Sequence, residues 1–340
     1  MSKIIVTGGA GYIGSHTLVD LIEHGHEVVS VDNFSRSSAD VFEGIRSITG
    51  VTVKNHTIDL CNYSDVRKLF EDEKDVAGVI HFAAFKSVGE SVEFPMKYYE
   101  NNVYSLVNVL KCIDECSIPN MVFSSSCSVY GNIDSLPVTE LTPLSKPECP
   151  YAATKQMGEQ MIQDFSKVVE SNSILLRYFN PVGAHPSGLI GEVPYDKPNN
   201  LVPVITQTAI GLQDKMFIWG GDYETRDGSC IRDYIHVMDI AAAHTLALDY
   251  LIHHKNESRC EIFNVGSGNG VSVFEAIASF EKVSGLQLNY ELGPRRAGDV
   301  VAIYANNQLI SERLGWHTQY GLDDMMSTAW AWEKKMSARR

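Results

Sequence analysis

The sequence lacks the features of a membrane-spanning, exported or nucleic-acid-binding protein. No apolar run approaches the ~18 residues that a membrane helix needs. The opening residues, SKIIVTGG, lack the charged and apolar regions of an export signal. Basic residues number 28 against 42 acidic ones, and the formal net charge of −14 disfavours binding to nucleic acid or an anionic membrane surface. We therefore expect a cytoplasmic protein with no nucleic-acid or membrane partner.

Cysteine is sparse, and its spacing suits neither a metal site nor a disulfide framework. The seven cysteines are an odd number, and Cys112 and Cys116, which share a helical face, have no Cys or His partner nearby. We expect reduced structural thiols and no metal. The 340 residues also contain no internal repeat, and a 44% hydrophobic, 21% charged composition predicts an ordinary globular protein of one or two domains.

Strand and helix patterns alternate through the first half of the chain. Apolar runs predict buried strands at 3–7, 26–32, 53–59, 77–83, 120–126 and 173–180. Helical patterns are present at 13–24 and near 62–73, 95–115 and 150–170. This alternation predicts an α/β fold with a doubly wound parallel sheet of the Rossmann type. After Asn180 the sequence is first rich in loop-forming residues and then has the pattern of mixed, shorter elements. We therefore divide the chain into domains at 1–180 and 181–340.

The loop after the first strand, TGGAGYIG, fits the dinucleotide-binding pattern. Gly8, Gly11 and Gly14 are spaced by three between a strand and a helix, where glycines permit a tight turn and the close approach of a pyrophosphate. Asp32 ends the second strand, where a carboxylate accepts from the ribose hydroxyls of NAD and would repel the 2′-phosphate of NADP. The alternative is a glycine-rich turn without a ligand. The context favours NAD.

The segment CPYAATK, residues 149–155, places a tyrosine and a lysine one helical turn apart. Proline is tolerated at a first helical position, so Tyr151 and Lys155 fall on one helix face. An ammonium beside a phenol favours the phenolate, so we expect a lowered Tyr151 pKa. Ser126 ends the predicted strand 120–126 and can converge with both on a reacting hydroxyl. The alternative is a surface tyrosine with a solvated lysine.

Several segments, in their order along residues 3–335, together resemble one enzyme family. The segments are VTGGAGYIGSHT, HFAAFKSVGES, YYENNV, SSSCSVYG, YAATK, RYFNPVGAHPSGLIGE, NNLVP, IRDYIHVMD and PRRAGD. They resemble the extended short-chain dehydrogenases/reductases and, within these, the UDP-glucose 4-epimerase (UDP-galactose 4-epimerase) family. The resemblance implies that 1–180 binds NAD and 181–340 binds a nucleotide sugar, with a segment near 234–265 returning to pack on the first domain.

The resemblance also implies roles for individual residues. Catalytic roles fall to Ser126, Tyr151 and Lys155. The implied NAD contacts are Gly8, Gly11, Tyr12, Ile13, Gly14, Asp32, Asn33, Ser35, Asp59, Leu60, Phe82, Ala83, Lys86, Asn101, Ser124, Tyr151, Lys155 and Phe179. The implied UDP-sugar contacts are Lys86, Ser126, Tyr151, Asn180, Asn200, Trp219, Arg232, Arg296, Asp299 and Ile303. Guanidinium groups suit a diphosphate independently of the resemblance. Arg295 and Asp233 are either helpers or surface charges.

The implied reaction is reversible epimerisation at C4 of UDP-hexoses through a 4-keto sugar. Tyr151 would take the 4-hydroxyl proton while C4 reduces NAD, with Lys155 lowering the Tyr151 pKa and Ser126 bridging to the same oxygen. The alternatives are a dehydratase or decarboxylase, a dehydrogenase with an external substrate, and a non-catalytic NAD-sensing protein. Family dehydratases carry an Asp-Glu pair after the serine or threonine, whereas Cys127 and Ser128 follow Ser126 here.

Two further expectations concern assembly and substrate choice. The family pairs the helices equivalent to 95–115 and 150–170 across a two-fold axis, which implies a homodimer; a monomer is the alternative. In the family, the residue four after the aspartate of Arg-Arg-x-Gly-Asp borders the sugar C2 substituent, and counting from Asp299 gives Ile303. An isoleucine in place of the family's tyrosine predicts that N-acetylated UDP-sugars are also accepted. The alternatives are that Tyr304 lines the wall instead, or that Ile303 packs in the core while another side chain fills the gap.

Overall fold

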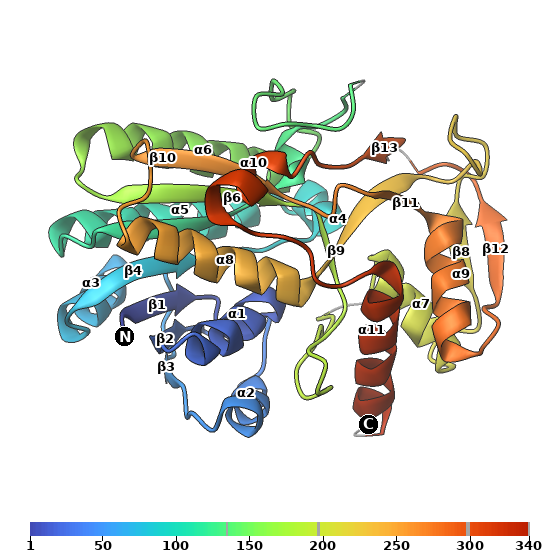
Figure 1. The fold of residues 1–340 in the computed structure, drawn as a ribbon, viewed down its shortest axis with the longest axis horizontal. Helices are drawn as coiled ribbons and strands as arrows, with labels where there is room; N and C mark the ends of the chain where they lie inside the picture. The colour runs from blue at the N-terminus through green and yellow to red at the C-terminus, as the bar shows by residue number, and fades with distance from the viewer. Residues whose placement is uncertain (134, 196–197, 297–299, 339–340) are drawn as a thin grey trace.

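The computed structural model describes residues 1–133, 135–195, 198–296 and 300–338 (Figure 1). Its largest element is a sheet of seven strands in the order β10-β6-β5-β4-β1-β2-β3, with every neighbouring pair parallel. The strands are β1 Lys3–Thr7, β2 Glu27–Val31, β3 Lys54–His56, β4 Val76–His81, β5 Asn120–Ser126, β6 Asn172–Tyr178 and β10 Cys260–Val265. The chain order reverses on either side of β1, which is the doubly wound arrangement. The predicted fold class is confirmed.

The inner strands form where the sequence is largely apolar or small because both faces of this sheet are covered. In β1, Ile4 and Val6 belong to one apolar cluster and Ile5 belongs to another, as the two-residue period of a strand requires. The first cluster includes Leu18 of the following helix, and the second includes Leu106 from the helix before β5. The sheet therefore separates two cores.

Helices cover both faces of the sheet. Packed with the first core are α1 Tyr12–Glu23, α2 Val41–Thr49, α8 Val237–Ile252 and α10 Gln308–Leu314. Packed with the second are α3 Tyr63–Asp72, α5 Pro95–Glu115 and α6 Pro150–Val168. A short helix, α4 Val88–Glu93, precedes α5, and a 3₁₀ turn, η1 Cys127–Val129, follows β5. The proline predicted to open a helix at residue 150 is the first residue of α6.

The remaining elements form a smaller mixed α/β group that gathers toward the right of Figure 1. Its four-stranded sheet contains β7 Asn180–Val182, β9 Ile231–His236, β11 Gly270–Ser272 and β13 Ala302–Ile303, and β11 is antiparallel to β9. A two-stranded sheet pairs β8 Met216–Trp219 with β12 Tyr290–Gly293. The helices are α7 Leu201–Ala209, α9 Val273–Ser284 and α11 Leu322–Ser337. Their apolar side chains form a third core.

The chain returns to the large sheet after β9. Helix α8 contributes Ile240 and Leu248 to the first core, and β10 pairs with β6 in parallel at the sheet edge. The six strands predicted in the first half are present, whereas α2 and α4 were not predicted. The domain division at residue 180 stays a prediction. Among the described residues, no helix is long and apolar enough to cross a membrane.

Candidate functional site

The glycine loop after β1 is shaped by close backbone contacts. Gly8 has a φ of +72°, and a Cβ there would lie 2.8 Å from the Ala83 nitrogen of the loop after β4. A Cβ on Gly14 would collide with the Gly8 carbonyl oxygen, so this glycine lets α1 pack against the turn. Gly11 caps the N-terminus of α1, where backbone N–H groups favour an anion. The predicted roles of a tight turn and close helix packing therefore match this geometry.

Asp32 follows β2 and is fixed beside the glycine loop. Its carboxylate accepts hydrogen bonds from the Ala10 nitrogen at 3.0 Å, the Phe34 nitrogen at 2.9 Å and the Ser37 hydroxyl at 2.8 Å. The bond from Ala10 ties the end of β2 to the glycine loop. A carboxylate held in this place is a suitable acceptor for ribose hydroxyls.

The other predicted NAD contacts divide into exposed loop residues and residues used in packing. Asn33 and Ser35 lie in the exposed loop after β2, and Asn33 accepts from the Ser35 nitrogen at 3.0 Å. Lys86, after β4, forms an ion pair with Glu192 at 2.9 Å. Tyr12 donates to the Gly183 carbonyl at 2.6 Å. Packing or backbone contacts involve Ile13, Asp59, Leu60, Phe82, Ala83, Asn101 and Phe179.

The three predicted catalytic residues converge at the carboxyl end of β5. Ser126 is the last residue of β5, and its side chain is hydrogen-bonded to Tyr151 in the first turn of α6. Lys155 is 4% exposed, its Nζ donates to the Ser124 carbonyl at 2.5 Å, and it lies 6.0 Å from the centroid of the Tyr151 ring. A hydroxyl, a phenol and an ammonium therefore share one site, in which Lys155 is buried and Ser126 and Tyr151 are half-buried.

The electrostatics of this site differ from the sequence-based prediction. Burial raises the pKa of Tyr151 well above its usual value, and the hydrogen bond to Ser126 opposes this only in part. Burial also lowers the pKa of Lys155 to about 7, while the charge of Glu159 raises it. The predicted lowering of the Tyr151 pKa by Lys155 is therefore wrong for this structure. The physical reason is that the ammonium contacts a backbone carbonyl, and desolvation of the phenolate dominates.

One buried neighbour of the site was not predicted. The Tyr178 hydroxyl at the end of β6 is hydrogen-bonded to the side chain of Ser124, the residue whose carbonyl binds Lys155. Burial raises the pKa of Tyr178, so its phenol is neutral. In the sequence, the sole indication that Tyr178 lies at the site was its position near the carboxyl end of a predicted strand.

Apart from Lys86, Ser126 and Tyr151, the predicted substrate residues in the described part of the chain lie on or next to the smaller group of elements. Trp219 ends β8, is 39% exposed and stacks on Phe217 with centroids 5.6 Å apart. Arg232 in β9 donates to the Val300 carbonyl at 2.5 Å. Asn200 caps α7 without a side-chain cap bond, and Asn180 begins β7. Arg296 lies at the end of a described segment, and Asp299 lies outside the described residues.

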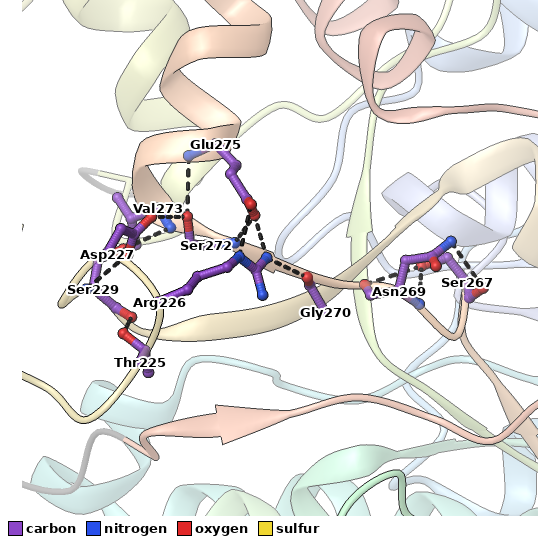
Figure 2. Close-up of polar contacts among 10 residues, drawn as sticks. All are labelled: Thr225, Arg226, Asp227, Ser229, Ser267, Asn269, Gly270, Ser272, Val273 and Glu275. Atoms are coloured by element: carbon purple, nitrogen blue, oxygen red, sulfur yellow. Dashed lines mark hydrogen bonds and ion pairs between the residues drawn. The ribbon is translucent and has the colours of Figure 1, made fainter.

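The loop that joins Trp219 to Arg232 is anchored by its own polar network (Figure 2). Arg226 donates from Nε to Glu275 of α9 at 2.7 Å and from Nη2 to the Gly270 carbonyl at 2.6 Å. Asp227 is hydrogen-bonded to Ser272 and accepts from the Ser229 nitrogen at 2.9 Å. These bonds fasten the loop to β11 and to the start of α9, which no sequence motif indicated.

Ile303 and Tyr304 point in different directions, as neighbours in an extended segment do. Ile303 pairs with Arg232 in register and is 6% exposed in a cluster with Val129 and Phe179, against which Cys127 packs. Tyr304 lies against Gly270, where an added Cβ would be 3.0 Å from its ring. Ile303 is therefore the neighbour that faces the end of β5, but it packs in an apolar cluster there, as the core-packing alternative has it. Its place in the sugar wall stays a prediction.

The two residues left open as helpers or surface charges are both engaged. Asp233 is fully buried and accepts from the Ser267, Gly268 and Ala305 nitrogens at 2.8, 3.1 and 3.0 Å, so it is not a surface charge. Arg295 is partly exposed and donates to Asp222 at 2.8 Å. Asp233 therefore has a structural role in joining β9 to the segment after β13.

Comparison with known proteins defines the relationship over the whole chain. The family model described as GDP-mannose 4,6 dehydratase matches residues 5–329. UDP-glucose 4-epimerase of Dictyostelium discoideum is 45% identical over 332 residues, covering 97% of this chain and 95% of that protein. The Bacillus subtilis protein of the same name is 43% identical, covering 97% and 96%.

Solved structures of related proteins match this chain over its whole length. UDP-glucose 4-epimerase from Stenotrophomonas maltophila, with bound NAD and formylated UDP-arabinopyranose, has a TM-score of 0.96 and 40% identity over 100% of both chains. The Bifidobacterium longum enzyme, in complex with NAD+ and UDP, has a TM-score of 0.93 and 40% identity over 98% of both. The parallel sheet, glycine loop and Ser–Tyr–Lys set define an extended short-chain dehydrogenase/reductase. Within that class, the chain belongs to the UDP-glucose 4-epimerase family.

Proposed function

We propose that the protein is an isomerase that interconverts UDP-glucose and UDP-galactose by epimerisation at C4, with NAD as resident cofactor. The observation that carries the proposal is the convergence of Ser126, Tyr151 and Lys155 at the carboxyl end of β5. The family relationship supports the substrate class, since the B. longum relative was solved with NAD+ and UDP.

The residues at the strand ends fit NAD. The glycine loop offers backbone N–H groups at the start of α1, and side chains at Gly8 or Gly14 would destroy its shape. Asp32 is a fixed acceptor for the adenosine ribose. Lys155, beside Ser124, suits the nicotinamide ribose. When bound, oxidised NAD supplies a hydride acceptor for C4 of the sugar.

The protein residues then move one proton and hold the sugar. Tyr151 accepts the proton of the 4-hydroxyl and returns it after the 4-keto sugar has turned over in the site. Ser126 contacts the same oxygen from the end of β5. Arg232 and Arg296 bind the diphosphate, so the sugar turns while its nucleotide stays bound. Burial raises the Tyr151 pKa, and the Lys155 ammonium does not offset this rise in the structure. The phenolate form therefore needs further positive charge close by, which oxidised NAD would add to that of Lys155 when bound.

The chemistry of Cys127 favours epimerisation over dehydration. This residue follows Ser126, where family dehydratases place a carboxylate, and burial raises the pKa of its thiol to about 12. A thiol that stays neutral at physiological pH is a poor acid or base for elimination. The match to the dehydratase family model therefore reflects shared descent and fold rather than this step.

One incubation tests the proposed function. The purified protein, without added cofactor, is mixed with UDP-glucose, UDP-galactose and their N-acetylated counterparts, and the products are separated. We expect the same ratio of UDP-glucose to UDP-galactose from either direction, without net NADH. Accumulating NADH with an oxidised product would indicate a dehydrogenase, and no conversion would indicate a binding protein.

We also propose a cytoplasmic homodimer formed through α5 and α6. These helices pack together, yet Tyr104 of α5 is 60% exposed and Met157 of α6 is 45% exposed. Val103 and Val107 extend this apolar face along α5 at helical spacing. A second copy of the same face would bury it around a two-fold axis. The seven free cysteines suit a reducing compartment.

A further inference from the structure

A charged pair is buried directly behind the catalytic site. Glu159 of α6 and Arg177 of β6 are 1% and 3% exposed. Arg177 donates to the two carboxylate oxygens of Glu159, from Nε at 2.8 Å and from Nη2 at 2.6 Å. A buried ion pair is weak evidence for stability, because apolar residues of similar volume do as well or better. The position of this pair behind the catalytic residues therefore suggests a role other than stabilising the fold.

The pair connects the catalytic helix to three strands. Ser125 of β5 donates to Glu159 Oε1 at 2.5 Å. Arg177 donates from Nη1 to the Tyr130 hydroxyl at 3.1 Å, and that hydroxyl donates to Asn264 of β10 at 2.6 Å. Helix α6, β5, β6 and β10 are thus joined through one side-chain network.

Lys155 and Glu159 contact consecutive residues of β5. They are four residues apart on α6, and so lie on one face of it. Lys155 donates to the Ser124 carbonyl, and Glu159 accepts from the side chain of the next residue, Ser125. This double contact fixes where the helix sits along the strand that ends in Ser126.

We propose that Glu159 is a positioning residue for the epimerisation: it sets the register of α6 on β5 and supplies the negative charge that keeps the Lys155 ammonium protonated in a buried site. This inference rests on the proposed function only for the part that the Lys155 ammonium plays in the reaction. The placement of Glu159 stands on the geometry.

The groups around Lys155 are consistent with this role. Burial lowers the pKa of Lys155 to about 7, and Glu159 opposes that shift. His81 of β4 faces the lysine, and burial lowers its pKa to about 3, so it adds no charge. Tyr151 on α6 and Tyr178 on β6 are neutral because burial raises the pKa of each. Arg177 is a cation, and its charge is paired with Glu159.

The sign of the effect follows from these charges. Replacing Glu159 by a neutral residue removes a charge that favours the ammonium, so the pKa of Lys155 falls further. The ammonium then loses its proton at a lower pH, and the alkaline limb of turnover moves to lower pH. An opposite charge within about 4–6 Å is worth about 1–3 pKa units.

The test measures Lys155 directly. Lysine labelled with ¹³C at the ε position is incorporated, the Lys155 resonance is assigned with Lys155→Met, and its titration is followed in wild type, Glu159→Gln and Glu159→Asp. We expect the midpoint to fall by about one unit or more in Glu159→Gln and to stay close to wild type in Glu159→Asp. Glu275→Gln, which also breaks a carboxylate–arginine pair, is the matched control and should leave the Lys155 midpoint unchanged.

A second variant separates this role from simple structural support. Glu159→Gln leaves Arg177 as an unpaired buried charge, so it is also destabilising. The double change Glu159→Gln with Arg177→Met removes both charges. If the pair is merely structural, the double variant has the wild-type titration midpoint of Lys155 and the wild-type dependence of turnover on pH. We expect a folded protein whose Lys155 midpoint and alkaline limb remain lowered. An unchanged midpoint in that variant overturns the proposal, whereas failure of the wild type to epimerise overturns the proposed function and leaves the titration readable.

Discussion

Replacing Tyr151 by phenylalanine separates chemistry from folding because it removes one oxygen and keeps the ring. The hydroxyl is hydrogen-bonded to Ser126, and a bond of this kind contributes about 0.5–1.5 kcal/mol to stability. A positioned acid/base contributes ~10²–10⁴-fold to rate, and ~10²-fold corresponds to about 2.7 kcal/mol. In free-energy terms, the expected loss of transition-state stabilisation therefore exceeds the expected loss of folding stability. We expect Tyr151→Phe to lower kcat by at least ~10²-fold.

The assay compares initial rates of UDP-galactose conversion, together with NAD content after acid release and the urea unfolding midpoint. Tyr63→Phe is the matched control, since the Tyr63 hydroxyl is bonded to Glu115 outside the site. We expect its turnover to equal that of wild type. If Tyr151→Phe keeps more than about a tenth of wild-type turnover, well above the expected loss, this residue does not carry the proton.

Three other outcomes follow from named residues. Ile303→Tyr should suppress reaction of the N-acetylated sugars ~10–200-fold relative to UDP-glucose and UDP-galactose; if Tyr304→Ala changes the preference instead, or wild type rejects the N-acetylated pair, this view of the sugar wall is wrong. Light scattering should give about twice the 37.7 kDa chain mass, and Tyr104→Glu should shift it toward the monomer; a wild-type monomer at micromolar concentration contradicts the dimer. Burial alone would raise the pKa of Glu73, but hydrogen bonds from Lys54, His56 and Lys3 lower it from 4.5 to about 2. The ionised Glu73 side chain therefore stabilises the folded protein above about pH 4.5, and this stabilisation is lost as the pH falls toward 2. Unfolding in urea at several pH values should therefore show a flatter acid dependence in Glu73→Gln, and identical slopes would refute this.

The fold could be predicted from the sequence because its strands are buried on both faces. Residues 4–7 and 121–126 are apolar or small throughout, and the helices between the strands carry ordinary start signals such as Pro150. Helices α2 and α4 were not predicted. Helix α4 buries only Ser91, which leaves little periodic signal. Helix α2 is amphipathic, with Val41, Ile45 and Ile48 against the first core, but it is only nine residues long.

The site could be predicted in part. Local motifs located Ser126, Tyr151 and Lys155, and the structure brings them together. The pKa of Tyr151 could not be predicted, since it depends on burial by elements distant in sequence. The charge of Arg177 inside an apolar strand was the available signal for the network behind the site, because a buried charge must find a partner. The individual ligand contacts, including that of Asp299 outside the described residues, stay predictions.

The central claim is that the sugar C4 is oxidised and reduced again by the same resident cofactor, so that its hydrogen returns to the carbon it left. The direct measurement uses UDP-galactose deuterated at C4, incubated with the purified protein without added cofactor and analysed by mass spectrometry and NMR. We predict UDP-glucose that keeps its deuterium at C4, with no product in the Tyr151→Phe variant above ~1% of the wild-type rate. Product that has lost the label to water, or a protein that forms no UDP-glucose, would contradict it.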